Sequence, residues 1–333
     1  AVGPHLRLGR GACIVGRQVT VGAGVSIGKG ASITCDHIEI EDGVMIGAGV
    51  TIRCRRLVLR SRARIDHSTT IYGLVTPNSG LEMGADSWLY SYCHVSTDEM
   101  VRIGARSAAG SHSLIFTHSS YLPITNGYPV TFAPVTIGEE VWLPWHVFVL
   151  PGATIGDGAT VGAMSLVGGS IPPRSLAVGV PAKVIKDEAS YRRSYDPAQL
   201  EALGRRVLAD VLRNFAGTFR PRHLFFPPRV QVDELSSDAW SLRSGKESLE
   251  VRWLQEASSP SMQTPILLVT VGRDSAPDGR CWWVDLSTLR AQYPADAPPI
   301  LAAFLEHFSV FGIRFGWRHP VVEPQSAPRA ARE

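Results

Sequence analysis

Aliphatic residues recur at every sixth position through the first half of the chain, and many are followed by Gly. A period of six matches neither an amphipathic helix, with a period of 3.6, nor an alternating strand, with a period of 2. Three hexads that each form a short flat face can close a triangular coil, in which every aliphatic residue points to the axis and stacks on its counterpart one coil later. The pattern therefore predicts a parallel β-helix with Gly at passable corners. The axial series is Val15, Val21, Ile27, Ile33, Ile40, Ile46, Ile52, Ile65, Ile71, Met83, Leu89, Val95, Ile103, Ala109, Ile115, Ile137, Leu143, Val149, Ile155, Val161 and Val167.

The period of six is interrupted at several places. Short slips near 34 to 40, 53 to 64, 72 to 83 and 95 to 103 predict bulges or small excursions of the coil. The longest interruption runs from His118 to Pro134; it is polar and contains the turn signal Asn126-Gly127. We expect this segment to leave the helix as an exposed loop, and long loops on compact scaffolds are often functional.

The pattern changes near Val180. Asp196-Pro197 predicts the start of an amphipathic helix that ends before Gly217. Two strands are predicted at 266–271 and 281–286, and a second helix at 300–311. We expect a β-helix domain at 1–187, an α+β domain of unknown role at 188–320 and a disordered tail at 321–333. The helix stripe is Leu200, Leu203, Val207, Val211 and Phe215, and Trp282, Trp283 and Trp317 are assigned to the core.

Composition narrows the class of protein. Charged residues make up 19% of the chain and the formal net charge is +3, which does not favour nucleic-acid binding. No apolar run approaches the roughly 20 residues of a membrane span. The five cysteines are odd in number and lack CxxC spacing, so free thiols in a reducing cytoplasm are expected. No signal peptide is recognisable, although the chain begins at Ala1 rather than at Met.

The stretch from Val135 to Lys186 contains several specific motifs. Val141-Trp142 opens a coil, Ile155-Gly156-Asp157-Gly158 forms a corner, and Gly179-Val180-Pro181-Ala182-Lys183 closes the series. With these motifs, residues 10 to 187 resemble the galactoside, maltose and xenobiotic O-acetyltransferases of the hexapeptide-repeat superfamily. The resemblance implies a left-handed β-helix, acetyl-CoA as co-substrate, no metal, and a homotrimer that holds the cofactor between neighbouring chains.

His118 matches the position of the catalytic base in that family, just before the protruding loop and ahead of the coil-opening Trp142. A sugar hydroxyl is a poor nucleophile until its proton is removed, and an imidazole with a pKa near 6.5 suits that task at neutral pH. We therefore expect His118 to activate an acceptor hydroxyl for attack on the thioester. If that assignment fails, His94 or His146 is the next candidate.

The resemblance also assigns binding roles. Trp142 lies beside acetyl-CoA in the family, and Gly162, Ala163 and Ser165 match positions whose backbone lines the cofactor channel. Lys183 and Lys186 are candidates for its phosphates. His94 stands where relatives carry an acceptor-binding Asn, which leaves its acceptor role open. Two departures are Gly168-Gly169-Ser170 in place of Thr-Lys-Asp, and Leu143-Pro144 in place of Ile-Gly.

Two other functions remain open from the sequence. A gamma-type carbonic anhydrase has a similar β-helix and binds zinc through three histidines, but His112 and His118 are six apart and should point about 120° apart from one chain. A catalytically silent scaffold that displays the C-terminal domain is the second alternative. His112 and His146 are otherwise expected to be surface residues of the coil.

Overall fold

A computed structural model describes residues 1–74, 76–120, 122–216, 230–244, 247–253, 266–270, 282–286, 291–292, 300–301, 304–305 and 308. The chain forms two compact units, Ala1–Arg193 and Ser194–Glu333. The predicted boundary after residue 187 lies within the first unit, at the start of the short helix α1 (Glu188–Tyr191). The predicted disordered tail at 321–333 lies outside the described residues.

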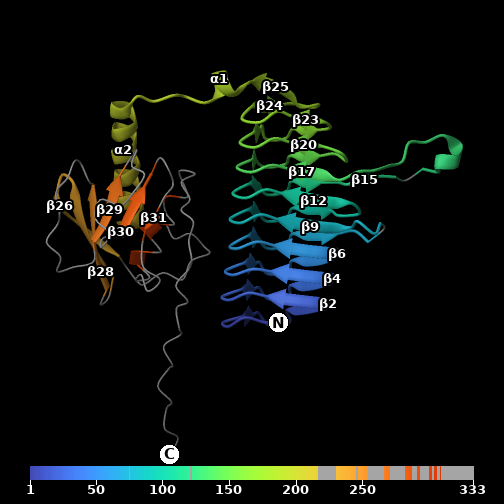
Figure 1. Ribbon diagram of the computed structural model, residues 1–333, viewed down its shortest axis with the longest axis horizontal. Coiled ribbons are helices and arrows are strands. Elements are labelled where there is room, and N and C mark those ends of the chain that lie inside the picture. The colour runs from blue at the N-terminus through green and yellow to red at the C-terminus, as the bar shows by residue number, and fades with distance from the viewer. Residues whose placement is uncertain are drawn as a thin grey trace, which may run out of the picture. The chain divides into compact units, whose positions relative to one another are not determined.

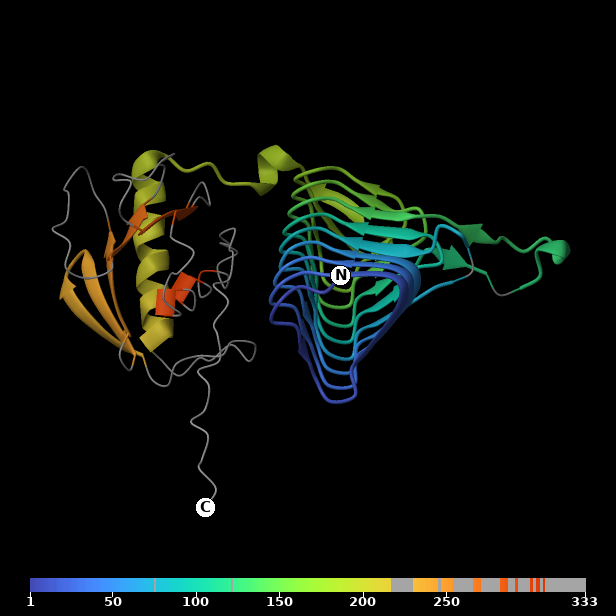
Figure 2. The ribbon, with the colours of Figure 1, turned by 60° about the horizontal axis from the view of Figure 1, so that its bottom comes forward.

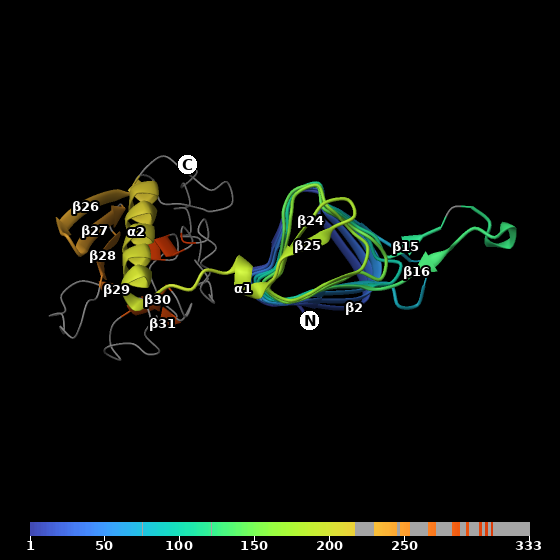
Figure 3. The same cartoon turned by 90° about the horizontal axis from the view of Figure 1, so that it is seen from above.

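The first unit is a left-handed parallel β-helix, which confirms the predicted fold (Figure 1). Viewed near its axis, the coil is triangular (Figures 2 and 3). One side is a ten-stranded sheet of β1 (Arg7–Leu8), β3 (Ser26–Ile27), β5 (Met45–Ile46), β7 (Arg64–Ile65), β10 (Trp88–Leu89), β13 (Ala108–Ala109), β18 (Trp142–Leu143), β21 (Thr160–Val161), β24 (Leu176–Val178) and β25 (Lys183–Lys186).

The other two sides belong to one thirteen-stranded sheet, because three long strands continue around the corner between them. These are β2 (Cys13–Val21), β4 (Ser32–Ile40) and β6 (Thr51–Leu59). The side that follows the ten-stranded sheet along the chain carries β8 (Thr70–Tyr72), β11 (His94–Ser96), β14 (Leu114–Ile115), β19 (Phe148–Val149) and β22 (Leu166–Val167). The remaining side carries β9 (Gly80–Met83), β12 (Met100–Ile103), β17 (Val135–Ile137), β20 (Thr154–Ile155) and β23 (Ser170–Ile171).

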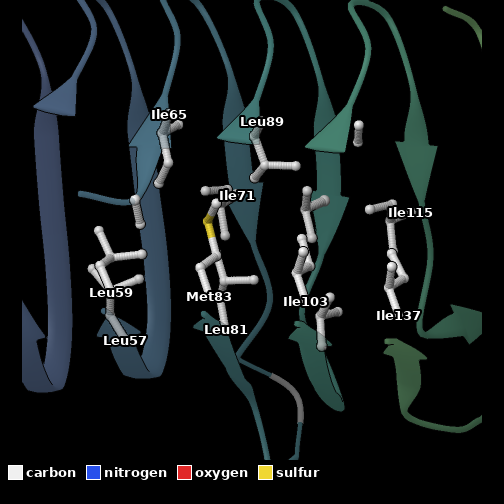
Figure 4. Close-up of a cluster of buried hydrophobic side chains, with 14 of the residues drawn as sticks. Leu57, Leu59, Ile65, Ile71, Leu81, Met83, Leu89, Ile103, Ile115 and Ile137 are labelled. Carbon is white, nitrogen blue, oxygen red and sulfur yellow. The ribbon is translucent and has the colours of Figure 1, made fainter. Parts of the chain in front are cut away.

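Stacked aliphatic side chains fill the axis of the coil. Every predicted axial residue from Val21 to Val167 is buried, and Figure 4 shows part of the stack from Ile65 and Leu89 to Ile137. Burial of one such side chain contributes roughly 1.5–3 kcal/mol. Gly at coil corners permits this stacking, since a Cβ on Gly28 would overlap the backbone of Ala48 in the next coil.

One axial prediction is wrong. Val15 is 57% exposed, and its neighbour Ile14 is the residue in register with the axial Ile33. The reason is the length of the first coils. Cys13 pairs with Ser32, 19 residues later, whereas a later coil repeats after 18 residues, from Phe148 to Leu166. The extra residue lies in the long strands, so the period of six does not extend back through them.

The second unit contains the predicted long helix, α2 (Pro197–Ala216). The Asp196 side chain accepts from the Gln199 backbone N–H at 2.8 Å, and the Gln199 side chain accepts from the Asp196 N–H at 3.2 Å, which forms a capping box. The apolar stripe differs in part from the prediction, because Leu203 is 37% exposed. The buried apolar residues of the helix are Val207, Leu208, Val211, Leu212 and Phe215.

A six-stranded sheet accompanies this helix. Its third, fourth and fifth strands pair in parallel, and the predicted strands at 266–271 and 281–286 correspond to β29 and β30. Ile300, Leu301, Phe304 and Leu305 are helical within the predicted 300–311 helix, and Trp317 lies outside the described residues. The strands are β26 (Gln231–Ser236), β27 (Ala239–Ser244), β28 (Glu247–Trp253), β29 (Ile266–Thr270), β30 (Trp282–Asp285) and β31 (Ala291–Gln292).

Candidate active site

His118 lies at the base of a hairpin that leaves the β-helix. Strand β15 (His118–Ser119) pairs antiparallel with β16 (Thr131–Phe132), and the short 3-10 helix η1 (Ile124–Asn126) lies near the tip (Figure 1). Gly127, which ends this turn, has a φ of 84°, a backbone conformation that Gly adopts without strain. The predicted loop is therefore a projecting arm with His118 at its root.

A buried carboxylate holds the ring of His118. The His118 Nδ1 lies 2.7 Å from Asp98 Oδ2 and 2.8 Å from Ser96 Oγ. Ser96 Oγ also donates to Asp98 Oδ2 at 3.2 Å. The Asp98 side chain is only 5% exposed, whereas that of His118 is 33% exposed. A proton on Nδ1 that is donated to Asp98 leaves the Nε2 lone pair available, as a general base requires.

The coil around Asp98 fixes this geometry. Thr117 Oγ1 donates to the Ser96 carbonyl at 3.0 Å and accepts from the Glu99 N–H at 3.0 Å. Gly73, from the preceding coil, packs so closely on this backbone that a Cβ there would overlap Asp98. Asp98 was not among the residues selected from the sequence. The sequence indicated only a slip in the period at 95 to 103. In the structure, the residues of this slip form a polar corner that contacts His118 through Ser96 and Asp98.

His94 lies close to His118, and the ring of Phe116 contacts both. The Phe116 ring centroid is 5.4 Å from that of His94 and 6.0 Å from that of His118. Burial, and the neighbouring His118, lower the pKa of His94 below its ordinary value. The structure therefore brings the two predicted histidines together, and His94 favours its neutral form.

Trp142 lies on the ten-stranded sheet of the β-helix, whereas His118 lies on the two-stranded sheet of β15 and β16. It belongs to an aromatic patch on this side of the coil. The patch consists of Trp88, Tyr90, Trp142 and Trp145. The Trp142 ring makes edge contacts with Tyr90 at 6.1 Å and with Trp145 at 6.2 Å, and Trp145 is 56% exposed. The aromatic patch thus presents apolar surface on a different sheet from the one that carries His118.

The remaining predicted cofactor residues cluster near the last coils. Gly162 and exposed Ala163 form the turn after β21, and Lys183 and Lys186 are exposed on β25. Ser165 differs from them because it is only 2% exposed, and its hydroxyl accepts from the Gly179 N–H at 2.9 Å. The Ser165 side chain therefore joins two parts of the coil in the interior.

The histidines expected at the surface form a stack along one corner. His112 and His146 are exposed; their rings lie 5.2 Å apart, and Tyr92 stacks on His112 at 5.0 Å. His112 is therefore engaged with Tyr92 and His146, whereas His118 contacts Asp98. Within the part of the chain that the structure describes, no group of three His, Cys, Asp or Glu side chains is arranged to hold a metal ion.

The parallel β-helix of hexads is the fold that the resemblance to the hexapeptide-repeat acyltransferases predicts. No protein-family profile matches the chain. Its sequence is 41% identical over 106 residues to WbbJ of Escherichia coli K12, which is named as a lipopolysaccharide biosynthesis O-acetyl transferase; the match covers 28% of this chain and 54% of WbbJ. It is 36% identical over 107 residues to WcaF of the same strain, named as a colanic acid biosynthesis acetyltransferase, with 32% and 58% covered.

The chain thus spans little more than half the length of these curated relatives. Among solved structures, the polysialic acid-specific acetyltransferase NeuO is 18% identical with a TM-score of 0.38, over 61% of this chain and 92% of NeuO. The Arabidopsis UDP-N-acetylglucosamine acyltransferase is 16% identical with a TM-score of 0.43, over 67% and 82%. The predicted resemblance to hexapeptide-repeat acetyltransferases is confirmed.

Proposed function

We propose that this protein is an acetyl-CoA-dependent O-acetyltransferase that acts on a hydroxyl of a sugar or polysaccharide precursor. The observation that carries the proposal is the His118 ring, whose Nδ1 is 2.7 Å from the buried Asp98 carboxylate while its other nitrogen is left for an acceptor. The curated relatives support it, since they are named as acetyltransferases of polysaccharide biosynthesis.

In the proposed reaction, His118 Nε2 removes the proton of the acceptor hydroxyl as its oxygen attacks the thioester carbonyl. The new C–O bond forms, the C–S bond breaks, and the departing thiolate takes the proton back from the imidazolium. Asp98 remains ionised and stabilises the cationic ring between the two transfers. The products are an acetyl ester and the free thiol.

The cofactor is assigned to the other sheet of the coil. Trp142 and the Gly162–Ala163 turn offer an apolar surface and accessible backbone, and Lys183 and Lys186 offer positive charge near the last coil. Ser165 stays in this set through its backbone, since its buried hydroxyl accepts from the Gly179 N–H. His94 is kept as an acceptor contact, since a neutral imidazole beside His118 can hydrogen-bond a sugar hydroxyl.

A homotrimer is part of the proposal. The side chains that would hold the cofactor and those that would activate the acceptor lie on different sheets of one chain. A neighbouring copy could bring the two sets together across one groove. Exposed apolar residues support association, both on the arm, where Leu122 is 47% and Ile124 66% exposed, and at Trp145.

We place the protein in the cytoplasm. Cys13, Cys35, Cys54 and Cys93 are free thiols, which persist in a reducing compartment. No helix in the described part of the chain is long and apolar enough to cross a membrane.

The test combines binding with turnover. Calorimetric titration should show acetyl-CoA binding, and a panel of sugars, nucleotide sugars and oligosaccharides should reveal acceptor-dependent release of free thiol. Absence of heat with acetyl-CoA or CoA at millimolar concentration would overturn the proposal.

A further inference from the structure

A column of residues in parallel register runs from the buried Ser96 of the candidate active site toward the N-terminal coils. Ser96, which hydrogen-bonds the His118 ring, is in parallel register with Tyr72 on the preceding coil. Tyr72 is in turn in register with Arg53 on the coil before that. Because adjacent strands lie about 4.8 Å apart, Arg53 is roughly 10 Å below Ser96 along the coil axis. The three residues therefore lie on one side of the β-helix, in line with the proposed base.

Tyr72 and Arg53 are both exposed on this side. Tyr72 is 49% exposed, and no ring or hydrogen-bond partner of its side chain occurs among the described residues. The ring can therefore offer a face to a ligand. Two residues before Tyr72 and Arg53 on the same strands are Thr70 and Thr51, which are polar and uncharged.

Arg53 differs from the other arginines of its coil. Arg55 contacts Asp36, Arg56 contacts Glu82, and Arg60 contacts two glutamates. For Arg53, no acidic or hydrogen-bonding partner is found within the described part of the chain. The surrounding surface is rich in ion pairs, but no described residue pairs with the Arg53 guanidinium. Its positive charge is therefore available to a ligand beside Tyr72.

Two excursions of the chain leave the triangle at the corner next to this column. One begins after β8, which ends at Tyr72, and the other is the arm that begins at β15 (Figures 2 and 3). The column thus runs beside both projecting segments, and it begins at the His118–Asp98 pair.

We infer that this column is an acceptor subsite for an extended acidic saccharide. The inference rests on the proposed function, because it places the reacting hydroxyl at His118. A neighbouring sugar ring packs on Tyr72, since the apolar face of a pyranose ring is suited to an aromatic side chain. A carboxylate one or two residues along the saccharide pairs with Arg53, whose planar fork matches carboxylate geometry. The acceptor is therefore an oligomer or polymer that contains carboxylated sugars, rather than a single neutral sugar.

The experiment measures saccharide binding without acetyl-CoA. Hexamers of galacturonic acid and of hyaluronan are the acidic probes, and maltohexaose and chitohexaose are the neutral ones, all titrated into the full chain. We expect tighter binding of at least one acidic hexamer than of either neutral one. Arg53→Gln should weaken acidic binding roughly 3- to 10-fold, the scale of one exposed charge-assisted contact, and leave neutral binding unchanged. The acidic preference should decline at about 1 M salt.

Two further variants make the result specific. Tyr72→Ala should weaken both classes of saccharide, because it removes stacking rather than charge. Lys29→Gln removes one positive charge from an exposed corner residue of a neighbouring coil and should change nothing. Equal binding of acidic and neutral hexamers, or an Arg53→Gln variant that binds like the parent, would overturn the inference. Because no acetyl donor is present, failure here is separate from failure of the proposed function, which would appear as missing acetyl-CoA binding.

Discussion

Replacement of Asp98 by asparagine tests whether the buried carboxylate orients the proposed base. Asparagine keeps the size of the side chain, but its amide nitrogen can take the place of Oδ2, 2.7 Å from His118 Nδ1. A donor there favours the tautomer with the proton on Nε2, which cannot accept a proton from the acceptor. The corresponding change in a serine-protease triad lowers kcat by about 10⁴. Because the His118 side chain is 33% exposed and its ring can reorient, we expect a smaller loss, about 10²- to 10³-fold, or roughly 3–4 kcal/mol of transition-state stabilisation.

The assay is acceptor-dependent thiol release at saturating acetyl-CoA, with kcat and KM measured separately and the thermal midpoint recorded for each variant. Ser96→Ala is the graded comparison, because it removes one contact to Nδ1 and leaves Asp98 in place. Its loss should be well below that of Asp98→Asn. A kcat for Asp98→Asn within about threefold of the parent, at an unchanged thermal midpoint, would show that Asp98 does not orient the base.

Two further predictions address the base and the coil. His118→Ala should lower turnover by about 100-fold or more, while acetyl-CoA binding changes little. His112→Ala removes an exposed histidine of the corner stack and should keep parental turnover. Equal effects of the two variants on turnover would refute the assignment of His118 as the base. Ile71→Ala, at a fully buried axial position, should lower the free energy of unfolding by roughly 2–5 kcal/mol in urea denaturation. Thr70→Ala, on the outward side of the same strand, should cost less than about 1 kcal/mol, and a reversed order would contradict the axial stacking.

The hexad pattern predicted the β-helix because the pattern follows from a simple geometric constraint of that fold. One aliphatic residue per face must point to the axis, so its period survives in the sequence even where the strands are only two residues long. The same constraint explains the error at Val15. The additional residue of β4 appeared in the sequence as the slip near 34 to 40, but the one in β2 did not, and the pairing of Ile14 with Ile33 reveals it.

The candidate site was less accessible to sequence reasoning. His118 could be selected because a long polar interruption and a known motif frame it. Asp98 could not, since its contact with His118 depends on how many residues the slip at 95 to 103 adds to a coil. Ser165 was selected by resemblance, and the structure shows a buried hydroxyl bonded to the Gly179 N–H. A motif position thus indicates where the backbone lies, while the side chain can form hydrogen bonds that stabilise the coil.

The separation of His118 and Trp142 on two sheets leads to a final prediction about assembly. If each site takes His118 from one copy and Trp142 from its neighbour, His118→Ala and Trp142→Ala inactivate different halves of the same site. In randomly mixed trimers made from equal amounts of the two variants, a site keeps both intact residues with a probability of about one quarter. Co-refolding the two variants should therefore restore roughly a quarter of the parental thiol release, although each alone is nearly inactive. Absence of recovery, in a mixture shown by mass spectrometry to contain hybrid trimers, would mean that His118 and Trp142 serve the same site from one chain or that Trp142 serves none.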